Sequence, residues 1–378
     1  RMSSSIFDRL SELPTWVALA PVVVGTLVTL AVNAECYNSE GKRRPKEMLA
    51  IQTTAKGKVE LCKVPVPVPK RGEMLVKVKY APINPSDVYC AMDVFNKDPP
   101  YPHGIGFEGS GVVVGSGGGF MPYWATKRQW RIAGRSLFGE GKFWAEYAVV
   151  RPEDMTPLPD NVALREGCLS NINPLTALGM LVVAQEGGHK AIVHTAASST
   201  LGLQLIRAAP KFNVKVVAVV RGDKNVKVLR DQVNHPEDLI VRTDVDTFAS
   251  DLKKAVQKVG ATLAFDAISG DVARVVYHAL PNRARMHTYG ELSGEPMPEE
   301  LVKKEDPNKP YSYYLVGPWL NAGGYWRKSK VGKYQYNLLA GELSSTVDKE
   351  FAMNDPALID AIYAYSKHQK SGKMVMKM

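Results

Sequence analysis

A run of small residues from Thr195 to Thr200 is the first feature of this 378-residue chain that could do chemistry. It follows the apolar segment AIVH, and Gly202 comes shortly after it. A dinucleotide pyrophosphate needs small residues at such a turn, because the backbone must approach it closely and offer amide hydrogens at the start of a helix. The candidate cofactor-binding residues are Thr195, Ala196, Ser198, Ser199, Thr200 and Gly202. The run is not a GxGxxG motif, so a plain tight turn that holds no ligand is the alternative.

A basic residue follows the next apolar segment, VKVVAVV. This residue is Arg221, nineteen positions after Gly202, with Lys224 close behind. An acidic residue here binds the ribose hydroxyl of NAD, whereas an arginine accommodates the additional phosphate of NADP. Arg221 and Lys224 therefore favour NADP(H), and a solvated arginine at a strand end is the alternative.

Strands that alternate with helices must position these residues. From Lys190 onward, the apolar segments AIVHTAA, VKVVAVV, DLIVRT, ATLAFDAI and ARMHTYG alternate with helices that begin near Thr200, Lys224, Asp246 and Asp271. This alternation requires right-handed crossovers and a parallel, doubly wound sheet. The sequence therefore predicts an α/β fold with a Rossmann domain at residues 173–307.

The preceding segment is rich in strands instead. Short strands broken by Gly and Pro are predicted at 73–80, 109–114, 131–138 and 143–150. The regular alternation ends after Pro296. Strands and helices of less certain type run from Tyr311 to the end, where we expect the chain to return to the first domain. The predicted β-rich domain comprises residues 47–172 and 308–378, and residues 1–46 form an anchor and linker.

Residues 13–34 contain no Lys, Arg, Asp or Glu, and residues 16–34 are almost wholly apolar. A helix of that length reaches about 28 Å, close to the thickness of the hydrocarbon core of a bilayer. We predict one transmembrane helix here, with a signal peptide, a transit peptide and a buried core helix as alternatives. The basic residues that follow, Lys42, Arg43, Arg44 and Lys46, place the folded part on the cytosolic or matrix side.

The composition argues against several other classes of protein. The net charge of +10 indicates an anionic partner. The chain has no recognisable nucleic-acid-binding motif, so we expect no binding to nucleic acid. The cysteines lie far apart without a CxxC pair, which predicts neither a disulfide framework nor a structural zinc site. The single histidines, His103, His194 and His287, are predicted to be structural or surface residues.

Several motifs, taken together, resemble a known family. They are INPSD at 83–87, GFEGSGVVV from Gly106, AEYAVV from Ala145, NPLTALGML from Asn173 and YGELSGEP from Tyr289. In this order they resemble the zinc-free quinone oxidoreductase and mitochondrial enoyl reductase branch of the medium-chain dehydrogenase/reductase superfamily. The resemblance runs from about Met48 to the C-terminus, and it implies a GroES-like catalytic domain beside the Rossmann domain.

The resemblance also implies site residues. Asn84 and Ser86 would line the catalytic cleft, and Thr176 would lie near the nicotinamide. Gly290 and Leu292 would form the far wall of the nicotinamide site. A capping or turn role is the alternative for Asn84 and Ser86, because such residues commonly precede helices.

The chain departs from the family pattern at two places. Zinc-dependent members have a cysteine within the INPSD segment and a His-Glu pair where this chain has Phe107 and Glu108, so no metal is expected. Enoyl reductases use a tyrosine eight residues beyond the Asp of INPSD, where this chain has Phe95. A phenyl ring cannot donate a proton, so quinone or enone reduction is favoured over reduction of acyl thioesters.

Two functions remain open from the sequence. The first is a membrane-tethered, NADPH-dependent oxidoreductase that transfers hydride to a quinone or an α,β-unsaturated carbonyl. The second is a catalytically degenerate accessory subunit of a large membrane complex, which could be respiratory, with neighbouring subunits as partners. In either case we expect a mitochondrial inner-membrane protein with its folded part on the matrix side.

Overall fold

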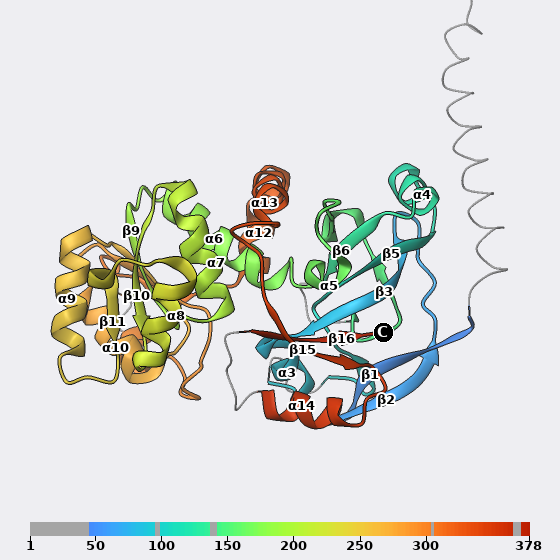
Figure 1. Cartoon of the computed structure of the whole chain (residues 1–378), viewed down its shortest axis with the longest axis horizontal. Coiled ribbons are helices and arrows are strands. Elements are labelled where there is room, and N and C mark those ends of the chain that lie inside the picture. The colour runs from blue at the N-terminus through green and yellow to red at the C-terminus, as the bar shows by residue number, and fades with distance from the viewer. Residues whose placement is uncertain (1–44, 95–98, 137–141, 304–305, 366–371) are drawn as a thin grey trace, which may run out of the picture.

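The computed structural model describes residues 45–94, 99–136, 142–303, 306–365 and 372–378 (Figure 1). The predicted membrane segment, residues 13–34, and the departure at Phe95 lie outside these residues. Within the described part of the chain, no helix has both the length and the apolar character needed to cross a membrane.

Strand β3 (Met74–Ile83) is central to the β-rich part of the molecule. The main sheet has the order β15-β16-β3-β5-β6-β8, and β7 also pairs with β3. Its other members are β5 (Glu108–Ser116), β6 (Arg131–Arg135), β7 (Tyr147–Val150), β8 (Met155–Pro157), β15 (Val347–Ala352) and β16 (Lys373–Lys377). Because β16 pairs antiparallel with β3, the end of the chain lies in the first sheet.

A smaller sheet and several short helices complete this part. The sheet consists of β2 (Lys58–Pro65), β1 (Glu47–Ala55) and β4 (His103–Gly104). The helices are α3 (Pro85–Ala91), α4 (Phe120–Lys127), α5 (Leu164–Gly167) and α14 (Ala357–Tyr365), with a 3-10 turn, η1 (Pro152–Asp154). Trp144 is fully buried in the core, and its indole N–H donates to the carbonyl of Pro82 at 3.0 Å.

The second sheet is parallel throughout and has the order β11-β10-β9-β12-β13-β14. Its strands are β9 (Ala191–Thr195), β10 (Lys215–Val220), β11 (Ile240–Arg242), β12 (Leu263–Asp266), β13 (Arg285–Thr288) and β14 (Tyr311–Tyr313). In chain order this is 3-2-1-4-5-6, the Rossmann order. The predicted parallel pairing of AIVHTAA with VKVVAVV is confirmed.

Helices cover both faces of this sheet (Figure 1). They are α6 (Ile172–Glu186), α7 (Thr200–Ala208), α8 (Asp223–Val233), α9 (Phe248–Val259), α10 (Gly270–Ala279) and α11 (Glu299–Lys303), with the turns η2 (Ala209–Phe212) and η3 (Glu237–Leu239). Alternate residues of β9 face the two layers: Ile192 packs into one apolar cluster, while Ala191 and Val193 pack into the other. The α/β fold with a Rossmann sheet beside a β-rich part is thereby confirmed.

The boundary at 307/308 differs from the prediction. Strand β14 pairs with β13 and so extends the Rossmann sheet. Helices α12 (Val316–Ala322) and α13 (Gly324–Leu338) then contact α6. The chain rejoins the β-rich sheet only at β15, so the predicted boundary at 307/308 lies too early in the chain. The other predicted domain limits stay predictions.

Candidate active site

The neighbouring strands β9 and β12 define the switch point of the Rossmann sheet, where successive connections leave in opposite directions and ligands bind in such folds. Thr195 ends β9 and is fully buried. Its hydroxyl donates to Asp266 Oδ1 at 2.7 Å and accepts from the N–H of Ala267 at 2.8 Å. The other carboxylate oxygen of Asp266 accepts from the N–H of Ser269 at 2.8 Å. These bonds lower the pKa of Asp266, but its burial, the larger effect, raises it.

The turn after Thr195 leads directly into helix α7. Ala196 has a φ of 50°, in the left-handed region. Ser199 caps the helix, and its hydroxyl accepts from the N–H of Gly202 at 3.1 Å. A Cβ on Gly202 would lie 2.3 Å from the carbonyl oxygen of Ala197, so only glycine fits this packing.

Two N–H groups at the start of α7, those of Thr200 and Leu201, have no acceptor within the described parts of the chain. Ser198 lies half-buried in the same turn. Unpaired N–H groups at a helix start, together with the helix dipole, favour an anion. The turn therefore fits the pyrophosphate of a dinucleotide.

Arg221 lies exposed at the carboxyl end of β10, and Lys224 is exposed on the helix that follows. The Arg221 side chain makes no hydrogen bond or ion pair with any residue that the structure describes. The nearby Arg242 differs, because it pairs with Asp223 at 2.6 Å and with Asp244 at 2.8 Å. Arg221 is thus available for an anionic ligand.

Gly290 and Leu292 follow β13 and lie against the end of β12. The N–H of Leu292 donates to the carbonyl of Ala267 at 3.0 Å, and a Cβ on Gly290 would lie 3.1 Å from that same oxygen. These two residues therefore line the same end of the sheet as Thr195.

His194 belongs to the core rather than to a ligand site. It is fully buried, and Tyr289 Oη lies 3.0 Å from its Nε2. Burial lowers the pKa of His194 to about 3, so the imidazole is neutral.

Asn84 is held in a buried polar network. Its side-chain amide donates to Glu108 Oε1 at 2.9 Å, and its carbonyl accepts from Lys373 Nζ at 2.7 Å. The other oxygen of Glu108 accepts from the N–H groups of Asn171 at 2.8 Å and Ile172 at 3.0 Å. Because Lys373 lies on β16, the network joins the C-terminal strand to the start of α6; burial raises the pKa of Glu108.

Asp87 closes the turn before α3. It accepts from the backbone N–H groups of Asn84 at 2.8 Å and Phe107 at 2.7 Å. Burial raises the pKa of Asp87 to about 7 despite these bonds. Asn84 therefore precedes α3 as its N-cap residue, and its side-chain amide bonds within the protein. Its place in the catalytic cleft stays a prediction.

The hydroxyls of Ser86 and Thr176 differ in their bonding. Thr176 donates to the carbonyl of Ile172 at 2.7 Å, one helical turn earlier. Ser86 Oγ is buried and has no hydrogen-bond partner among the described residues. Of the three predicted catalytic residues, Ser86 alone retains its full hydrogen-bonding capacity.

The structure brings the predicted residues together in two groups. Asn84 and Thr176 are linked through Glu108 and Ile172, whereas the candidate cofactor residues gather at the carboxyl end of the Rossmann sheet. Sequence reasoning did not assign roles to Asp266, Glu108 and Lys373. Asp266 could have been found because it ends an apolar strand, and Glu108 because it lies in a quoted motif, but the sequence gives no signal for Lys373.

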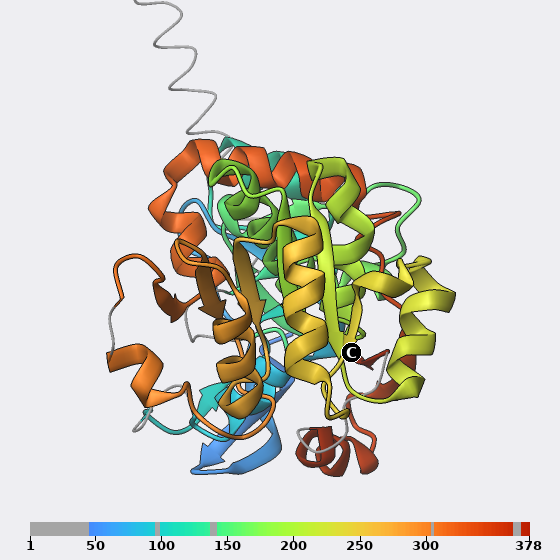
Figure 2. The ribbon, with the colours of Figure 1, turned by 90° about the vertical axis from the view of Figure 1, so that its left-hand side faces the viewer.

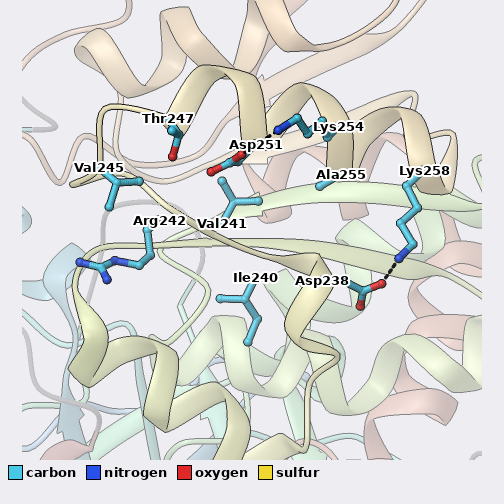
Figure 3. A pocket seen from close by; sticks show the side chains of 10 residues that line it. All are labelled: Asp238, Ile240, Val241, Arg242, Val245, Thr247, Asp251, Lys254, Ala255 and Lys258. Carbon is cyan, nitrogen blue, oxygen red and sulfur yellow. Dashed lines mark hydrogen bonds and ion pairs between the residues drawn. The ribbon is translucent and has the colours of Figure 1, made fainter.

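A surface hollow of about 450 Å³ lies elsewhere, between β11 and α9 at the edge of the Rossmann sheet (Figure 3). Arg242 and Lys258 line it, together with apolar residues such as Ile240. None of the predicted site residues lines this hollow. Over the described ranges, no group of three His, Cys, Asp or Glu side chains could hold a metal ion.

Comparisons with known proteins agree with this architecture. Residues 70–160 match the alcohol dehydrogenase GroES-like domain. The chain is 27% identical over 271 residues to the mitochondrial enoyl-[acyl-carrier-protein] reductase of Schizosaccharomyces pombe, covering 67% of this chain and 72% of that protein. It is 27% identical over 230 residues to the rat synaptic vesicle membrane protein VAT-1 homolog, covering 59% of this chain and only 53% of that protein.

Solved structures show the same fold. A protein of Mesorhizobium loti assigned as an NADPH:quinone reductase matches with a TM-score of 0.74 at 24% identity, covering 89% of this chain and 99% of that one. A mycobacterial protein complexed with NADPH matches with a TM-score of 0.71 at 18% identity, covering 88% of this chain and 100% of that one. The chain has the two-domain fold of a medium-chain dehydrogenase/reductase. It resembles that superfamily in its GroES-like domain, which is matched over residues 70–160, and in its parallel-sheet Rossmann domain.

Proposed function

We propose that this protein is a zinc-independent, NADPH-dependent oxidoreductase that transfers hydride to a quinone or an α,β-unsaturated carbonyl. The observation that carries the proposal is the arrangement at the switch point. A turn opens α7, and its N–H groups at Thr200 and Leu201 have no acceptor among the described residues. Arg221, whose side chain has no partner among those residues, directly follows the next strand, β10. Solved structures of the same fold include an NADPH complex and proteins assigned as NADPH:quinone reductases, which supports this choice of cofactor and substrate class.

The chain's own residues would divide the binding work. The N–H groups of Thr200 and Leu201 bind the pyrophosphate, and Arg221 with Lys224 binds the 2′-phosphate. The segment from Gly290 to Leu292 forms the wall beside the nicotinamide. When bound, NADPH supplies the hydride; the protein orients it and excludes water.

Ser86 would bind the substrate. Its hydroxyl, which has no hydrogen-bond partner among the described residues, can donate to the carbonyl oxygen on which negative charge develops, where an oriented donor stabilises the transition state. Asn84, fixed by Glu108 and Lys373, positions the turn that carries Ser86. Thr176 borders the nicotinamide side.

The test uses the purified full-length chain. We expect it to oxidise NADPH with a panel of quinones and small enones, and Ser86→Ala to lower kcat/KM by about 10- to 100-fold without changing the Kd for NADPH. Ser250→Ala, an exposed serine on α9, is the matched control and should retain full activity. Equal activity of Ser86→Ala and Ser250→Ala would remove Ser86 from the mechanism.

A degenerate accessory subunit is the second candidate. It is favoured by one observation: the amide of Asn84 and the donor of Thr176 are both used within the protein, which leaves few free polar groups for chemistry. Absence of NADPH turnover, with co-migration of the chain in a large complex in mild detergent, would favour this role. Free migration with turnover would exclude it.

We also propose that residues 13–34 tether the protein to a membrane, with the folded part on the matrix side of the mitochondrial inner membrane. This proposal rests on the charge-free apolar sequence. The match to an enzyme named as mitochondrial agrees with that compartment.

A further inference from the structure

Helix α4 exposes large apolar side chains to solvent. Phe120 is 80% exposed, and Met121 and Trp124 are each 40% exposed. The helix is anchored on its other side by the buried Pro122 and Ala125. Several exposed apolar side chains on two turns of helix form a patch, and such patches usually mark a binding surface.

Helix α13 has the same character. Tyr325 is 76% exposed and Trp326 is 82% exposed, whereas Val331 and Gln335 are buried on the inner face. At 3.6 residues per turn, Trp326 projects on the side opposite Val331 and shares that side with the exposed Lys333. The outward face of α13 therefore combines aromatic rings with positive charge.

Both helices lie at the same end of the molecule. In Figures 1 and 2 they form the upper edge, with α13 beside the Rossmann domain and α4 on the β-rich domain. Neither helix contains an Asp or a Glu. The basic residues on or directly after them are Lys127, Arg128, Arg327, Lys328, Lys330 and Lys333.

The start of the described chain is connected to the start of α4 through one short segment. The N–H of Val66 donates to the carbonyl of Lys46 at 3.1 Å, and the N–H of Gly72 donates to the carbonyl of Gly118, just before α4, at 2.9 Å. Residues 66–72 connect the two points and span about 20 Å at most. Val68 within this segment is 80% exposed. The apolar segment 13–34 and the basic residues after it thus precede a point that one short segment connects to α4.

We propose that α4, α13 and residues 66–72 form a docking face for an anionic phospholipid bilayer. Trp and Tyr rings favour the headgroup region, exposed apolar side chains favour the acyl boundary, and Lys and Arg are attracted to anionic lipid. The absence of acidic residues from both helices favours a negatively charged surface as the partner. The docking face would hold both domains against the membrane that residues 13–34 enter, and it does not depend on the proposed redox activity.

The test separates the docking face from the tether. The full-length chain, with a protease recognition sequence inserted between residues 35 and 44, is reconstituted into phosphatidylcholine vesicles with or without phosphatidylserine, cleaved and sedimented. We expect the released folded part to stay on phosphatidylserine vesicles at low salt and to leave them at high salt. Phe120→Ser with Trp326→Ser, and separately Arg128→Glu with Lys333→Glu, should each lower the retained fraction about tenfold or more.

Matched controls keep the outcome specific. Lys215→Glu with Lys253→Glu makes the same change of net charge on exposed residues of β10 and α9, and should leave retention unchanged. Far-UV circular dichroism and urea unfolding verify that each variant is folded. Equal release of wild type and both face variants would overturn the proposal. Loss of a dimer in the face variants, with unchanged vesicle retention, would also overturn it and assign the face to a second copy of the chain.

Discussion

The hydroxyl of Thr195 donates a 2.7 Å hydrogen bond to Asp266, and this bond joins the ends of β9 and β12 at the switch point. The same hydroxyl accepts from the N–H of Ala267, so one buried side chain fixes both strand ends. A glycine at this position could not make either bond. The turn that replaces a glycine-rich motif is therefore held by a threonine and a carboxylate, and its geometry is set before any ligand arrives.

Thr195→Val should lower the free energy of unfolding by about 1–3 kcal/mol, because it leaves Asp266 and the N–H of Ala267 with one partner fewer in a buried site. Urea unfolding followed by circular dichroism measures this change. Ser250→Ala removes a hydroxyl from an exposed position and should have little effect. A loss no larger than that of Ser250→Ala would show that the bond between the strands contributes nothing measurable.

The buried Lys373 should be essential for stability. It is the cation beside the Asn84 and Glu108 network, so Lys373→Met leaves buried carboxylates without compensation and should cost about 3–5 kcal/mol. Adding Glu108→Gln to this variant should recover part of the loss, as a double-mutant cycle would measure. Lys63→Met, which breaks an exposed ion pair with Glu47, is the control and should leave stability unchanged. Strict additivity of the two buried substitutions would contradict the coupling.

His194 should make the protein sensitive to acid. Its pKa is lowered to about 3 in the folded protein, below the ordinary value of 6.5. Between these values the unfolded chain binds the extra proton, so stability decreases as the pH falls, by about 2 kcal/mol near pH 5. His194→Gln, which retains an acceptor for Tyr289, should remove this part of the dependence, as urea midpoints from neutral pH downward would show. An unchanged slope in the variant would mean that another group titrates.

The segment 13–34 should behave as an integral anchor. Neither high salt nor alkaline carbonate should release the full-length protein from membranes, whereas detergent should, because burial of the span is worth many kcal/mol. A chain without residues 1–34 should fold normally, since β1 begins only at Glu47. Immunoblots of pellet and supernatant measure the distribution. Release by salt alone would contradict the anchor.

Local pattern was sufficient to predict the Rossmann sheet. Strands β9, β10, β11 and β12 are rich in apolar residues, and an amphipathic helix follows each, so periodicity and crossover handedness predict a parallel, doubly wound sheet. Strand β14 was not predicted, because Tyr311–Tyr313 is too short to show a period and gains its partner only from β13.

The site was predictable only in part. The positions of Thr195, Ser199 and Arg221 follow from strand ends, which local sequence marks well. The contact of Lys373 with Asn84 joins residues that are 289 positions apart, and no local signal reports such a contact. The side-chain contacts of Asn84 come from Lys373 and Glu108, which are both distant in sequence, so the sequence alone left its role open.

The most direct test of the central claim is the binding of NADPH and NADH to wild type and Arg221→Ala, measured by isothermal titration calorimetry. Arg221 is exposed and unpaired within the described residues, so its guanidinium is free to bind the 2′-phosphate. We predict that the wild type prefers NADPH and that Arg221→Ala weakens NADPH binding by about 10- to 150-fold while NADH binding stays unchanged. Arg230 lies on α8 and forms an ion pair with Glu237, so Arg230→Ala should change the binding of neither cofactor. Equal weakening of both cofactors, or no binding of either by the wild type, would contradict the proposal that this chain is an NADPH-dependent reductase.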